Sequence, residues 1–441
     1  MQGSPTFPGF PPGPPPARHL FEELGFLSDV RRDVLGTIAH RFATYGDLYY
    51  AEAIGHDVYA TCHPDLIRDV LVTEARAFKK RTLDLEVLGN GLLLSDGEAW
   101  RIQRRRIQPG FRHESIQRYG QLIAEETERL VARLRPGQVI EARSEMMELT
   151  LRIVCRALFG QHFNGDPRRL TRALRVLQEQ VVLPKLVPKW MPTPMNLRLR
   201  RMRALVDREV FGIIDRGAEP GSLLAELIAT TDEQGGMTRQ QLRDEVVTLF
   251  LAGHETTALA LSWALYLLAQ HPGVAHALAD EARAAARGEP LCAKDFDALP
   301  LAARVLQETM RLYPPVYVIP RVCSEPTSLA GFPIRPNAEM WLWVYFMHHD
   351  ARWFREPERF RPERFLPGGE AELCPHAFIP FGEGNRACVG RHFAMLEAVL
   401  VLAGVLRKFR VQLVDVRPVR PLPRITLGPA RPIRLRLEAN G

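Results

Sequence analysis

The residues best placed to do chemistry lie in one glycine-rich run, Phe381-Gly-Glu-Gly-Asn-Arg-Ala-Cys-Val-Gly390, which contains Cys388. A cysteine binds a metal as its thiolate, and nearby backbone N–H groups and positive charge keep it deprotonated. Gly384 and Gly390 let the backbone approach and turn, Arg386 adds positive charge, and the following helical pattern brings a helix N-terminus. A soft thiolate beside an apolar wall suits a haem iron, so the run predicts a thiolate ligand to haem.

Two other interpretations of this run are a small buried cysteine and a dinucleotide-binding fingerprint. Gly382-x-Gly384-x-x-Ala387 matches the fingerprint loosely, and Asp415 ends a later apolar stretch at a plausible distance. The residues after Asp415 are too few for the remaining strands and helices of a doubly wound sheet. The thiolate ligand therefore remains the favoured interpretation.

A second chemical segment, Ala252-Gly-His-Glu-Thr-Thr257, lies in the middle of a long apolar helical pattern. An acid beside an alcohol is costly to bury without partners, and Glu255 has no charged neighbour within a turn apart from His254. Gly253 weakens a helix by roughly 1 kcal/mol relative to alanine, and threonine hydroxyls bend a helix by bonding to carbonyls one turn earlier. These features predict a local opening that holds water and delivers protons, with a kink tolerated for packing as the alternative. His254-Glu255 begins like the zinc motif H-E-x-x-H, but Ala258 stands at the second histidine position, so no zinc site is expected.

Both segments resemble signatures of the cytochrome P450 monooxygenases. The cysteine run matches F-x-x-G-x-R-x-C-x-G at every fixed position, and the second segment matches A-G-x-D/E-T-T. The resemblance implies that Cys388 is the axial ligand of the haem iron. It implies that Glu255 relays protons, that Thr256 hydrogen-bonds dioxygen and its water, and that Ala252 lies on the distal haem face beside the substrate. The other cofactor-binding residues of the cysteine run are Phe381, Gly384, Arg386 and Gly390.

Two further motifs predict a structural ion-pair cluster. Glu308-Thr-Met-Arg311 matches the family's E-x-x-R, and apolar neighbours indicate that this pair is buried. The resemblance completes the pair with an arginine from a Phe-x-Pro-x-Arg-Phe segment, which matches Arg364. Arg359 lies in a near-duplicate of that segment, but only Arg364 lies in the full motif. We expect Glu308, Arg311 and Arg364 to hold the cysteine side of the fold and to take no part in the chemistry.

A fifth motif, Trp100-x-x-x-Arg104, places two hydrogen-bond donors on one helix face, which suits a carboxylate. The resemblance makes that carboxylate a haem propionate and adds Arg321 and Arg386 to the residues that bind it. The neighbouring Arg101, Arg105 and Arg106 point elsewhere on the same helix. They would attract an acidic electron donor, with ordinary solvated charges as the alternative.

The resemblance also implies the fold, the cofactor and the reaction. The expected fold is mainly α with small antiparallel β-sheets, and haem b lies between a long central helix and the cysteine loop. The expected enzyme inserts one oxygen atom from O2 into a hydrophobic organic substrate, with electrons from NAD(P)H through a separate ferredoxin or flavodoxin and its reductase. Rival readings are a peroxide-using relative, which typically lacks the acid–alcohol pair, and a haem carrier or gas sensor, which needs no proton relay.

The expected substrate pocket is mainly apolar, which favours a fatty acid, terpenoid, steroid or polyketide. Tyr317 is a possible hydrogen-bonding partner, or polar handle, for the substrate. Lys79, Lys80 and Arg81 also allow a substrate that is anchored by its carboxylate. The pocket residues we expect are Leu88, Leu92, Leu93, Leu249, Ala252, Val316, Tyr317 and Val318.

Helical patterns dominate the chain. The clearest runs from Arg239 to Gln270, begins at the capping box Thr238-x-x-Gln241, and would span about 48 Å. Strand signals cluster at 49–60, 316–345 and 409–440, and prolines break the helical pattern over 183–196. The other expected helices cover 20–43, 64–71, 118–134, 146–159, 168–182 and 197–217.

Length, composition and cysteine use limit the remaining possibilities. We expect residues 1–18, which hold seven prolines, to be flexible, and residues 19–441 to form a single catalytic domain without a fused reductase. Six scattered cysteines predict a reduced, cytoplasmic compartment, and no apolar stretch is long enough for a membrane span. The net charge of +7 fits an acidic protein partner better than nucleic acid, because no nucleic-acid motif accompanies it. A monomer is expected.

Overall fold

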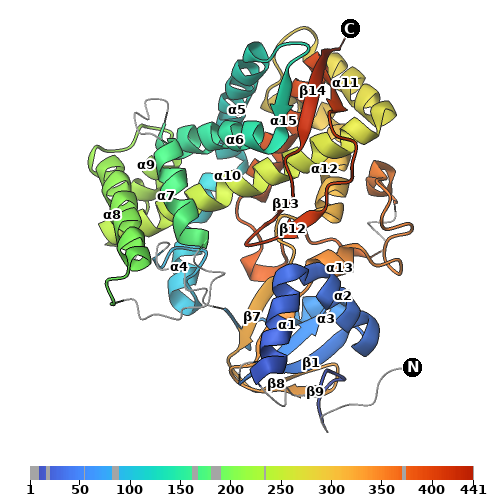
Figure 1. Ribbon diagram of the computed structural model, residues 1–441. Helices are drawn as coiled ribbons and strands as arrows, with labels where there is room; N and C mark the ends of the chain where they lie inside the picture. Colours follow the sequence, from blue (N-terminus) through green and yellow to red (C-terminus); the bar gives the residue numbers. More distant parts are fainter. Residues whose placement is uncertain are drawn as a thin grey trace. The chain divides into compact units, whose positions relative to one another are not determined.

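The computed structural model describes residues 9–15, 20–53, 55–81, 89–160, 167–179, 190–232, 235–369 and 374–440. These residues are mostly helical with small sheets, which confirms the expected fold class (Figure 1). They form two compact units. Unit 1 comprises Met1–Arg81, Gln307–Cys388 and Pro421–Gly428, and unit 2 comprises Thr82–Leu306, Val389–Arg420 and Pro429–Gly441.

Unit 1 is built on a five-stranded sheet with the order β1-β2-β10-β7-β3. Its strands are β1 (Leu48–Ala53), β2 (His56–Thr61), β3 (Phe78–Lys80), β7 (Ile319–Cys323) and β10 (Glu339–Leu342). The expected hairpin at 49–60 is present, with Tyr50 opposite Tyr59. One pairing departs from the antiparallel expectation, because β10 runs parallel to β2. Apolar side chains such as Tyr59, Met340 and Leu342 form the core around this sheet.

The remaining elements of unit 1 are short. They are α1 (Leu20–Arg32), α2 (Val34–Tyr45), α3 (Pro64–Arg68), a π-helical turn (Asp69–Thr73), α13 (Val344–His348), β8 (Thr327–Leu329), β9 (Phe332–Ile334), β12 (Pro421–Pro423) and β13 (Leu427–Pro429). Helix α12 (Pro300–Leu312) enters unit 1 at Gln307.

The described part of the proline-rich segment packs against the sheet of unit 1, although the sequence predicted flexibility there. The ring of Phe10 lies 4.5 Å from that of Tyr50, and the Tyr50 N–H donates to the Pro12 carbonyl at 3.1 Å. A Cβ at Gly13 would overlap the Tyr50 carbonyl. Residues 9–15 therefore contact β1 through a ring contact and a backbone hydrogen bond.

Unit 2 is organised around α10 (Arg239–Gln270), whose bounds and capping box match the prediction. Most of its side chains are buried, and α6 (Ala142–Phe159) runs beside it (Figure 1). The other helices of unit 2 are α4 (Gly97–Ile107), α5 (His113–Arg133), α7 (Pro167–Glu179), α8 (Pro194–Asp215), α9 (Leu223–Ala229), α11 (Pro272–Ala286) and α15 (Arg391–Lys408). Its strands are β4 (Val139–Glu141), β5 (Thr231–Asp232), β6 (Gly235–Gly236), β11 (Phe409–Leu413) and β14 (Arg434–Ala439), and β11, β14 and β4 form an antiparallel sheet.

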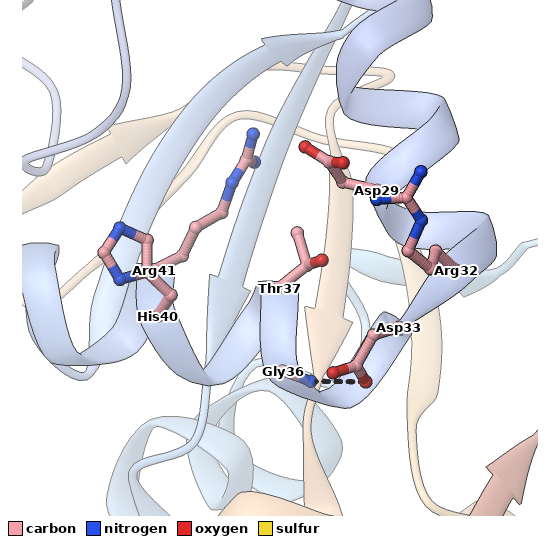
Figure 2. A pocket seen from close by; sticks show the side chains of 7 residues that line it. All are labelled: Asp29, Arg32, Asp33, Gly36, Thr37, His40 and Arg41. Carbon is pink, nitrogen blue, oxygen red and sulfur yellow. Dashed lines mark hydrogen bonds between the residues drawn. The ribbon is translucent and has the colours of Figure 1, made fainter.

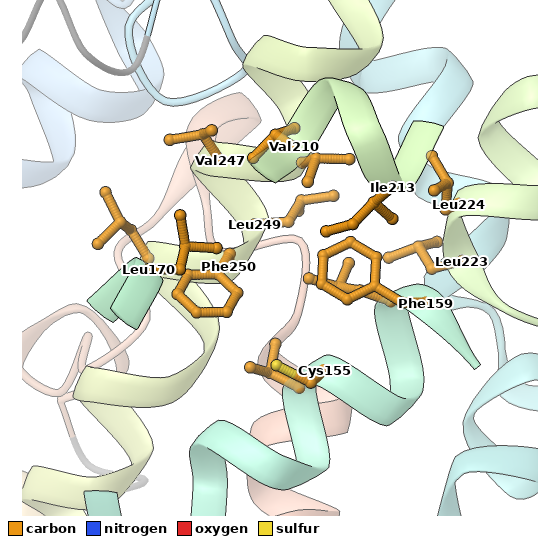
Figure 3. Packing of buried hydrophobic residues seen from close by; sticks show 14 of the residues in the cluster. Cys155, Phe159, Leu170, Val210, Ile213, Leu223, Leu224, Val247, Leu249 and Phe250 are labelled. Atoms are coloured by element: carbon orange, nitrogen blue, oxygen red, sulfur yellow. The ribbon is translucent and has the colours of Figure 1, made fainter. Parts of the chain in front are cut away.

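The core of unit 2 joins α6, α7, α8, α9 and α10 through apolar side chains (Figure 3). Phe250 of α10 and Phe159 of α6 are among the largest residues of this cluster, and Val210 of α8 lies with them. Cys155 is also part of the cluster, and burial raises the pKa of its thiol. Cys155 is therefore a packing residue without reactivity.

Three helix starts differ from the prediction, two of them for local reasons, and the helix predicted over 20–43 is divided into α1 and α2. Helix α5 begins at His113, five residues before the predicted start. Helix α8 begins at Pro194, three residues early, because Thr193 caps it by accepting from the Asn196 N–H at 3.2 Å and proline is tolerated in a first turn. Helix α6 begins at Ala142, because the Glu141 carboxylate accepts from the Ser144 N–H at 2.7 Å. The predicted helical end at 180–182 and the first half of the proline-rich break, 183–189, lie outside the described residues.

Candidate active site

The cysteine loop belongs to unit 1 and presents an exposed thiol. Cys388 follows a short 3-10 turn, Gly384–Arg386, and its N–H donates to the Phe381 carbonyl at 2.9 Å. Helix α15 begins three residues later with Gly390 as its N-cap, and no side chain caps its first N–H groups. The loop is thus closed on itself by backbone hydrogen bonds, and Cys388 is exposed at its end.

Backbone geometry explains why glycine is needed at two positions of this loop, but not at a third. Gly382 and Gly384 have φ of +70° and +72°, and a Cβ at Gly384 would overlap the Leu71 carbonyl. Gly390 has φ of −91°, and its Cβ would lie at an ordinary 3.5 Å from the Phe111 ring. Within the protein, Gly390 therefore has neither a positive φ nor a close contact, and its place beside the cofactor stays a prediction. Gly382 shares the positive φ of Gly384 but not its close contact, because the nearest atom to its Cβ, on Ile319, is 4.0 Å away.

The expected propionate donors lie in both units. Trp100 and Arg104 are half-buried, one turn apart on α4 in unit 2. Arg321 of β7 is buried and donates to the Pro320 carbonyl at 3.0 Å, and Arg386 is half-buried in the cysteine loop. All four side chains only donate hydrogen bonds, so each suits an acidic group.

The three neighbouring arginines of α4 do not form one patch. Arg101 and Arg105 are exposed, and Arg101 lies 3.4 Å from the Glu98 carboxylate. Arg106 is buried and donates to the Gly235 carbonyl at 2.6 Å. Arg106 is therefore a structural residue, which corrects its assignment to a docking surface.

The central segment of α10 is accessible on one side of an otherwise buried helix. Ala252 is exposed and Glu255 and Thr256 are half-buried, whereas the flanking turns are buried. The Thr256 hydroxyl donates to the Ala252 carbonyl at 2.9 Å, as predicted for threonine in a helix. The α-helix continues unbroken through this segment, so the predicted local opening is not a break in the helix.

The opposite side of the same segment packs tightly on α6. A Cβ at Gly253 would lie 2.9 Å from Val154, and the Thr150 hydroxyl donates to the His254 carbonyl at 2.9 Å. The His254 ring is buried, with Nδ1 donating to the Phe250 carbonyl at 2.7 Å. Gly253 and His254 are therefore packing residues, and no group of three or more potential metal ligands occurs among the described residues.

Two residues that sequence reasoning missed lie beside the acid–alcohol pair. The Arg143 guanidinium of α6 lies 3.7 Å from the Glu255 carboxylate. Glu397 of α15 is fully buried near Thr257, and burial raises the pKa of its carboxyl well above the usual range. No local sequence pattern points to either residue, because the role of each depends on packing against α10.

The structure brings Glu308, Arg311 and Arg364 together in the interior of unit 1. Arg311 donates to the Glu308 carboxylate through Nε at 2.7 Å and Nη2 at 2.9 Å, and Arg364 Nε donates to it at 3.0 Å. The exposed Arg359 pairs with Glu356 and contributes only its backbone carbonyl to the cluster. Arg364 and not Arg359 therefore completes the buried pair.

The residues expected to line the substrate pocket differ in how far they are buried. Leu92 is half-buried against the core of unit 2, Leu93 is exposed, and Leu249 is buried in that core. In unit 1, Val316 is exposed and Val318 packs on an aromatic cluster. Leu88 lies outside the described residues.

Tyr317 does not fit its assignment as a polar handle. Its ring is buried in the aromatic cluster, with its centroid 6.1 Å from that of Trp343. Its hydroxyl donates to the Arg424 carbonyl at 2.7 Å, and burial raises its pKa to about 12. The hydroxyl is committed to the fold, which corrects the prediction.

A polar hollow of about 450 Å³ on α1 and α2 contains none of the predicted chemical residues (Figure 2). Its lining residues are Asp29, Arg32, Asp33, Gly36, Thr37, His40 and Arg41. Asp33 caps α2 by accepting from the Gly36 N–H at 2.9 Å. The hollow lies at a helix start and is not the candidate active site.

The donor set fits a haem. Cys388 is exposed in a loop that backbone hydrogen bonds close and whose glycines allow its positive φ angles, which suits an axial ligand. Arg386 lies in the same loop of unit 1. In unit 2, Trp100 and Arg104 are donors that would suit propionates, and the accessible strip of α10 carries a small residue, Ala252, beside an acid and an alcohol. When bound, the haem supplies the activation of dioxygen.

Comparison with known proteins gives a consistent result. The family model described as Cytochrome P450 matches residues 11–436. Cyclooctatin synthase of Streptomyces melanosporofaciens is 34% identical over 407 residues, which are 88% of this chain and 88% of the relative. Pentalenene oxygenase of Streptomyces avermitilis is 31% identical over 412 residues, 90% of this chain and 91% of the relative.

A solved structure of retinoic acid bound cyanobacterial CYP120A1 has the same fold, with a TM-score of 0.88, 24% identity, and coverage of 98% of this chain and 100% of that chain. No helix in the described ranges is long and apolar enough to cross a membrane. The family match covers the cysteine loop, the acid–alcohol segment and the buried ion-pair cluster alike. This chain belongs to the cytochrome P450 family of haem-dependent monooxygenases.

Proposed function

We propose that this monooxygenase hydroxylates a terpenoid, a largely hydrocarbon molecule with few polar groups. This proposal rests on the names of two relatives, because cyclooctatin and pentalenene are terpenoids. The described residues of the expected pocket also fit it. Leu92, Leu93 and Val316 are half-buried or exposed apolar side chains, and the one expected polar handle, Tyr317, has its hydroxyl bonded within the fold. Such a site binds its substrate by shape and apolar contact.

We propose Cys388 as the axial ligand of haem b, with Trp100, Arg104, Arg321 and Arg386 binding the propionates. The exposed position of the thiol supports this role, since a ligand must reach the metal as a thiolate. Gly382 and Gly384 allow the positive φ that the loop needs, and backbone hydrogen bonds such as that from the Cys388 N–H to the Phe381 carbonyl hold its conformation. The buried cluster of Glu308, Arg311 and Arg364 stiffens the part of unit 1 that carries the loop.

Glu255 and Thr256 are proposed to move protons from solvent into the site. Glu255 is half-buried, so its carboxylate contacts water while its stem belongs to the helix. Arg143 limits where this carboxylate points. Thr256 donates to a helix carbonyl, which leaves the oxygen lone pairs of its hydroxyl to accept from water or substrate.

Electrons are proposed to come from NAD(P)H through a ferredoxin or flavodoxin with its reductase. The exposed Arg101 and Arg105 of α4 would attract an acidic carrier. Residues 19–441 are taken as one catalytic domain, acting as a monomer in the cytoplasm.

A ligand screen tests the substrate class. The purified ferric protein is titrated with terpenoid hydrocarbons and mono-alcohols, fatty acids, steroids and polyketides, and the spin-state shift that follows loss of the iron-bound water is recorded. We expect polycyclic terpenoids to give the largest shifts at the lowest concentrations. A screen in which fatty acids bind and terpenoids do not would contradict the proposal.

A further inference from the structure

The segment Gly89–Leu94 is bound to the first half of α10 by two neighbouring carboxylates, all within unit 2. The Asn90 N–H donates to the Asp244 carboxylate at 2.9 Å, and the Leu92 N–H donates to the Glu245 carboxylate at 2.9 Å. Both acids are buried, and the Glu245 side chain is fully so. A buried carboxylate is costly unless it is hydrogen-bonded, and a buried backbone N–H needs an acceptor. Asp244 and Glu245 meet both needs, because they accept from alternate N–H groups of the segment.

Steric contacts show how closely the segment lies on the helix. Gly89 has φ of +59°, and a Cβ there would overlap the Asp244 carboxylate. A Cβ at Gly91 would lie 2.6 Å from the Asp244 carbonyl oxygen and would overlap the Thr248 hydroxyl. Glycine is therefore required at both positions for the backbone to reach the two carboxylates.

Other elements hold the same anchor in place. The Gln103 side chain of α4 donates to the Asn90 carbonyl at 2.7 Å. Asp244 also accepts from Gln240 at 2.9 Å and from Arg243 at 3.1 Å, and Arg243 donates to Asp207 of α8 at 2.8 Å. The segment is thus tied to α4 and α10 directly and to α8 through one arginine.

Glu245 keeps its acceptor role whether or not it carries a proton. Burial raises its pKa to about 8, so it is mainly neutral near neutral pH. A neutral carboxylic acid still accepts a hydrogen bond through its carbonyl oxygen. Glutamine is therefore the closest neutral substitute for Glu245, whereas alanine removes the acceptor.

We propose that Asp244 and Glu245 are positioning residues that fix Gly89–Leu94 on α10, and that through Leu92 and Leu93 this anchor determines which carbon of the substrate is oxidised. The proposal rests on the proposed function, because it takes these two leucines as part of the substrate pocket. Neither carboxylate touches the substrate. Their effect passes through the backbone that they hold.

Hydrogen exchange of the haem-loaded protein, followed by mass spectrometry, tests the anchor itself. Glu245→Ala should speed exchange of the Leu92 amide about tenfold or more, because this N–H loses its buried acceptor. Glu245→Gln should exchange as the wild type does. Gln241→Ala is the matched control, since it weakens the cap of the same helix without contacting the segment. Wild-type exchange in Glu245→Ala would overturn the anchor.

Product analysis tests the effect on selectivity. With any substrate that the wild type oxidises to more than one product, Glu245→Ala should change the product ratio at least about twofold, and Glu245→Gln should restore it. Gly91→Ala leaves both carboxylates in place but displaces the segment, so it should give the same change even if Glu245→Ala fails to fold. Faster exchange with an unchanged ratio in both variants would overturn the link to selectivity. Failure of the proposed terpenoid class appears separately, as absence of terpenoid binding by the wild type.

Discussion

The guanidinium of Arg143 lies 3.7 Å from the carboxylate of Glu255, which joins helix α6 to the chemical segment of α10. Both side chains are partly exposed, so this contact orients the acid more than it stabilises the fold. The same stretch of α6 supplies Thr150, which binds the His254 carbonyl. Helix α6 therefore holds the backbone of this segment and one of its two chemical side chains.

Replacement of Arg143 by methionine should reduce product formed per electron consumed by about two- to fivefold, because Glu255 loses the cation that orients it. Product and NAD(P)H consumption are measured together with a surrogate electron-transfer pair. Arg152→Met is the control, since Arg152 lies on the same helix and pairs with Glu126 and Glu148 instead. Equal coupling in the Arg143 variant and the wild type would show that the contact has no catalytic role.

Loss of the Thr256 hydroxyl should uncouple electron use from oxidation. Thr256→Ala should lower product per electron about tenfold and release hydrogen peroxide, whereas Thr256→Ser, which keeps the hydroxyl, should recover most of the coupling. Substrate binding, followed by the spin-state shift, should change little in both. If alanine and serine variants remain coupled, the proton-relay assignment is wrong.

Substitution of two arginines that lie in nearly identical motifs should have different effects on stability, because only one of them belongs to the buried ion-pair cluster. Arg364→Met leaves the Glu308 carboxylate buried without one of its partners, which should cost about 3–5 kcal/mol of unfolding free energy and impair haem retention. Arg359→Met removes an exposed side chain that pairs with Glu356, so it should change stability little. Urea unfolding of both variants gives the comparison, and equal losses would contradict the assignment.

Two alanine substitutions separate backbone strain from steric overlap in the cysteine loop. Gly382→Ala should cost about 1–2 kcal/mol, because it meets only an unfavourable φ, with its nearest neighbour 4.0 Å from the new Cβ. Gly384→Ala should cost more, because the Cβ also overlaps the Leu71 carbonyl. Thermal unfolding and haem content are measured for each. A Gly384 variant as stable as the Gly382 variant would show that the Leu71 contact is dispensable.

Glu245 should give the protein a pH-dependent stability. Its folded pKa of about 8 lies above the 4.5 of an ordinary glutamate, so the folded state holds this proton more tightly than the unfolded state does. Its contribution is fully favourable below about pH 4.5, falls by up to about 1.4 kcal/mol per pH unit as the pH rises, and levels off above about pH 8. Glu245→Gln should therefore gain stability relative to the wild type between pH 5 and 8 in urea unfolding, and a constant difference would contradict this pKa.

Local features of the sequence were sufficient to predict the central helix and the buried ion pair. The capping box at Thr238 and the His271-Pro272 end depend on neighbouring residues, so α10 could be bounded correctly. The cysteine loop was recognised because its glycines, arginine and cysteine are contiguous. The buried pair of Glu308 and Arg311 lies within one helical turn, and its third member was identified by motif alone.

Features that depend on tertiary packing could not be predicted in the same way. Arg143 and Glu255 are distant in sequence, and nothing local to either indicates their contact. Tyr317 was assigned to a pocket because its neighbours are apolar, but the acceptor for its hydroxyl comes from Arg424, far along the chain. The strands β3 and β4 are three residues long, too short for an alternating pattern to be visible.

The reduced carbon-monoxide spectrum tests the central claim most directly. The purified, haem-loaded protein should show the red-shifted absorption band of a thiolate-bound haem, and Cys388→Ser should lose that band even in preparations that retain haem. A haem-loaded wild type without the red-shifted band, or a Cys388→Ser variant that keeps it, would contradict the assignment of Cys388 as the thiolate ligand.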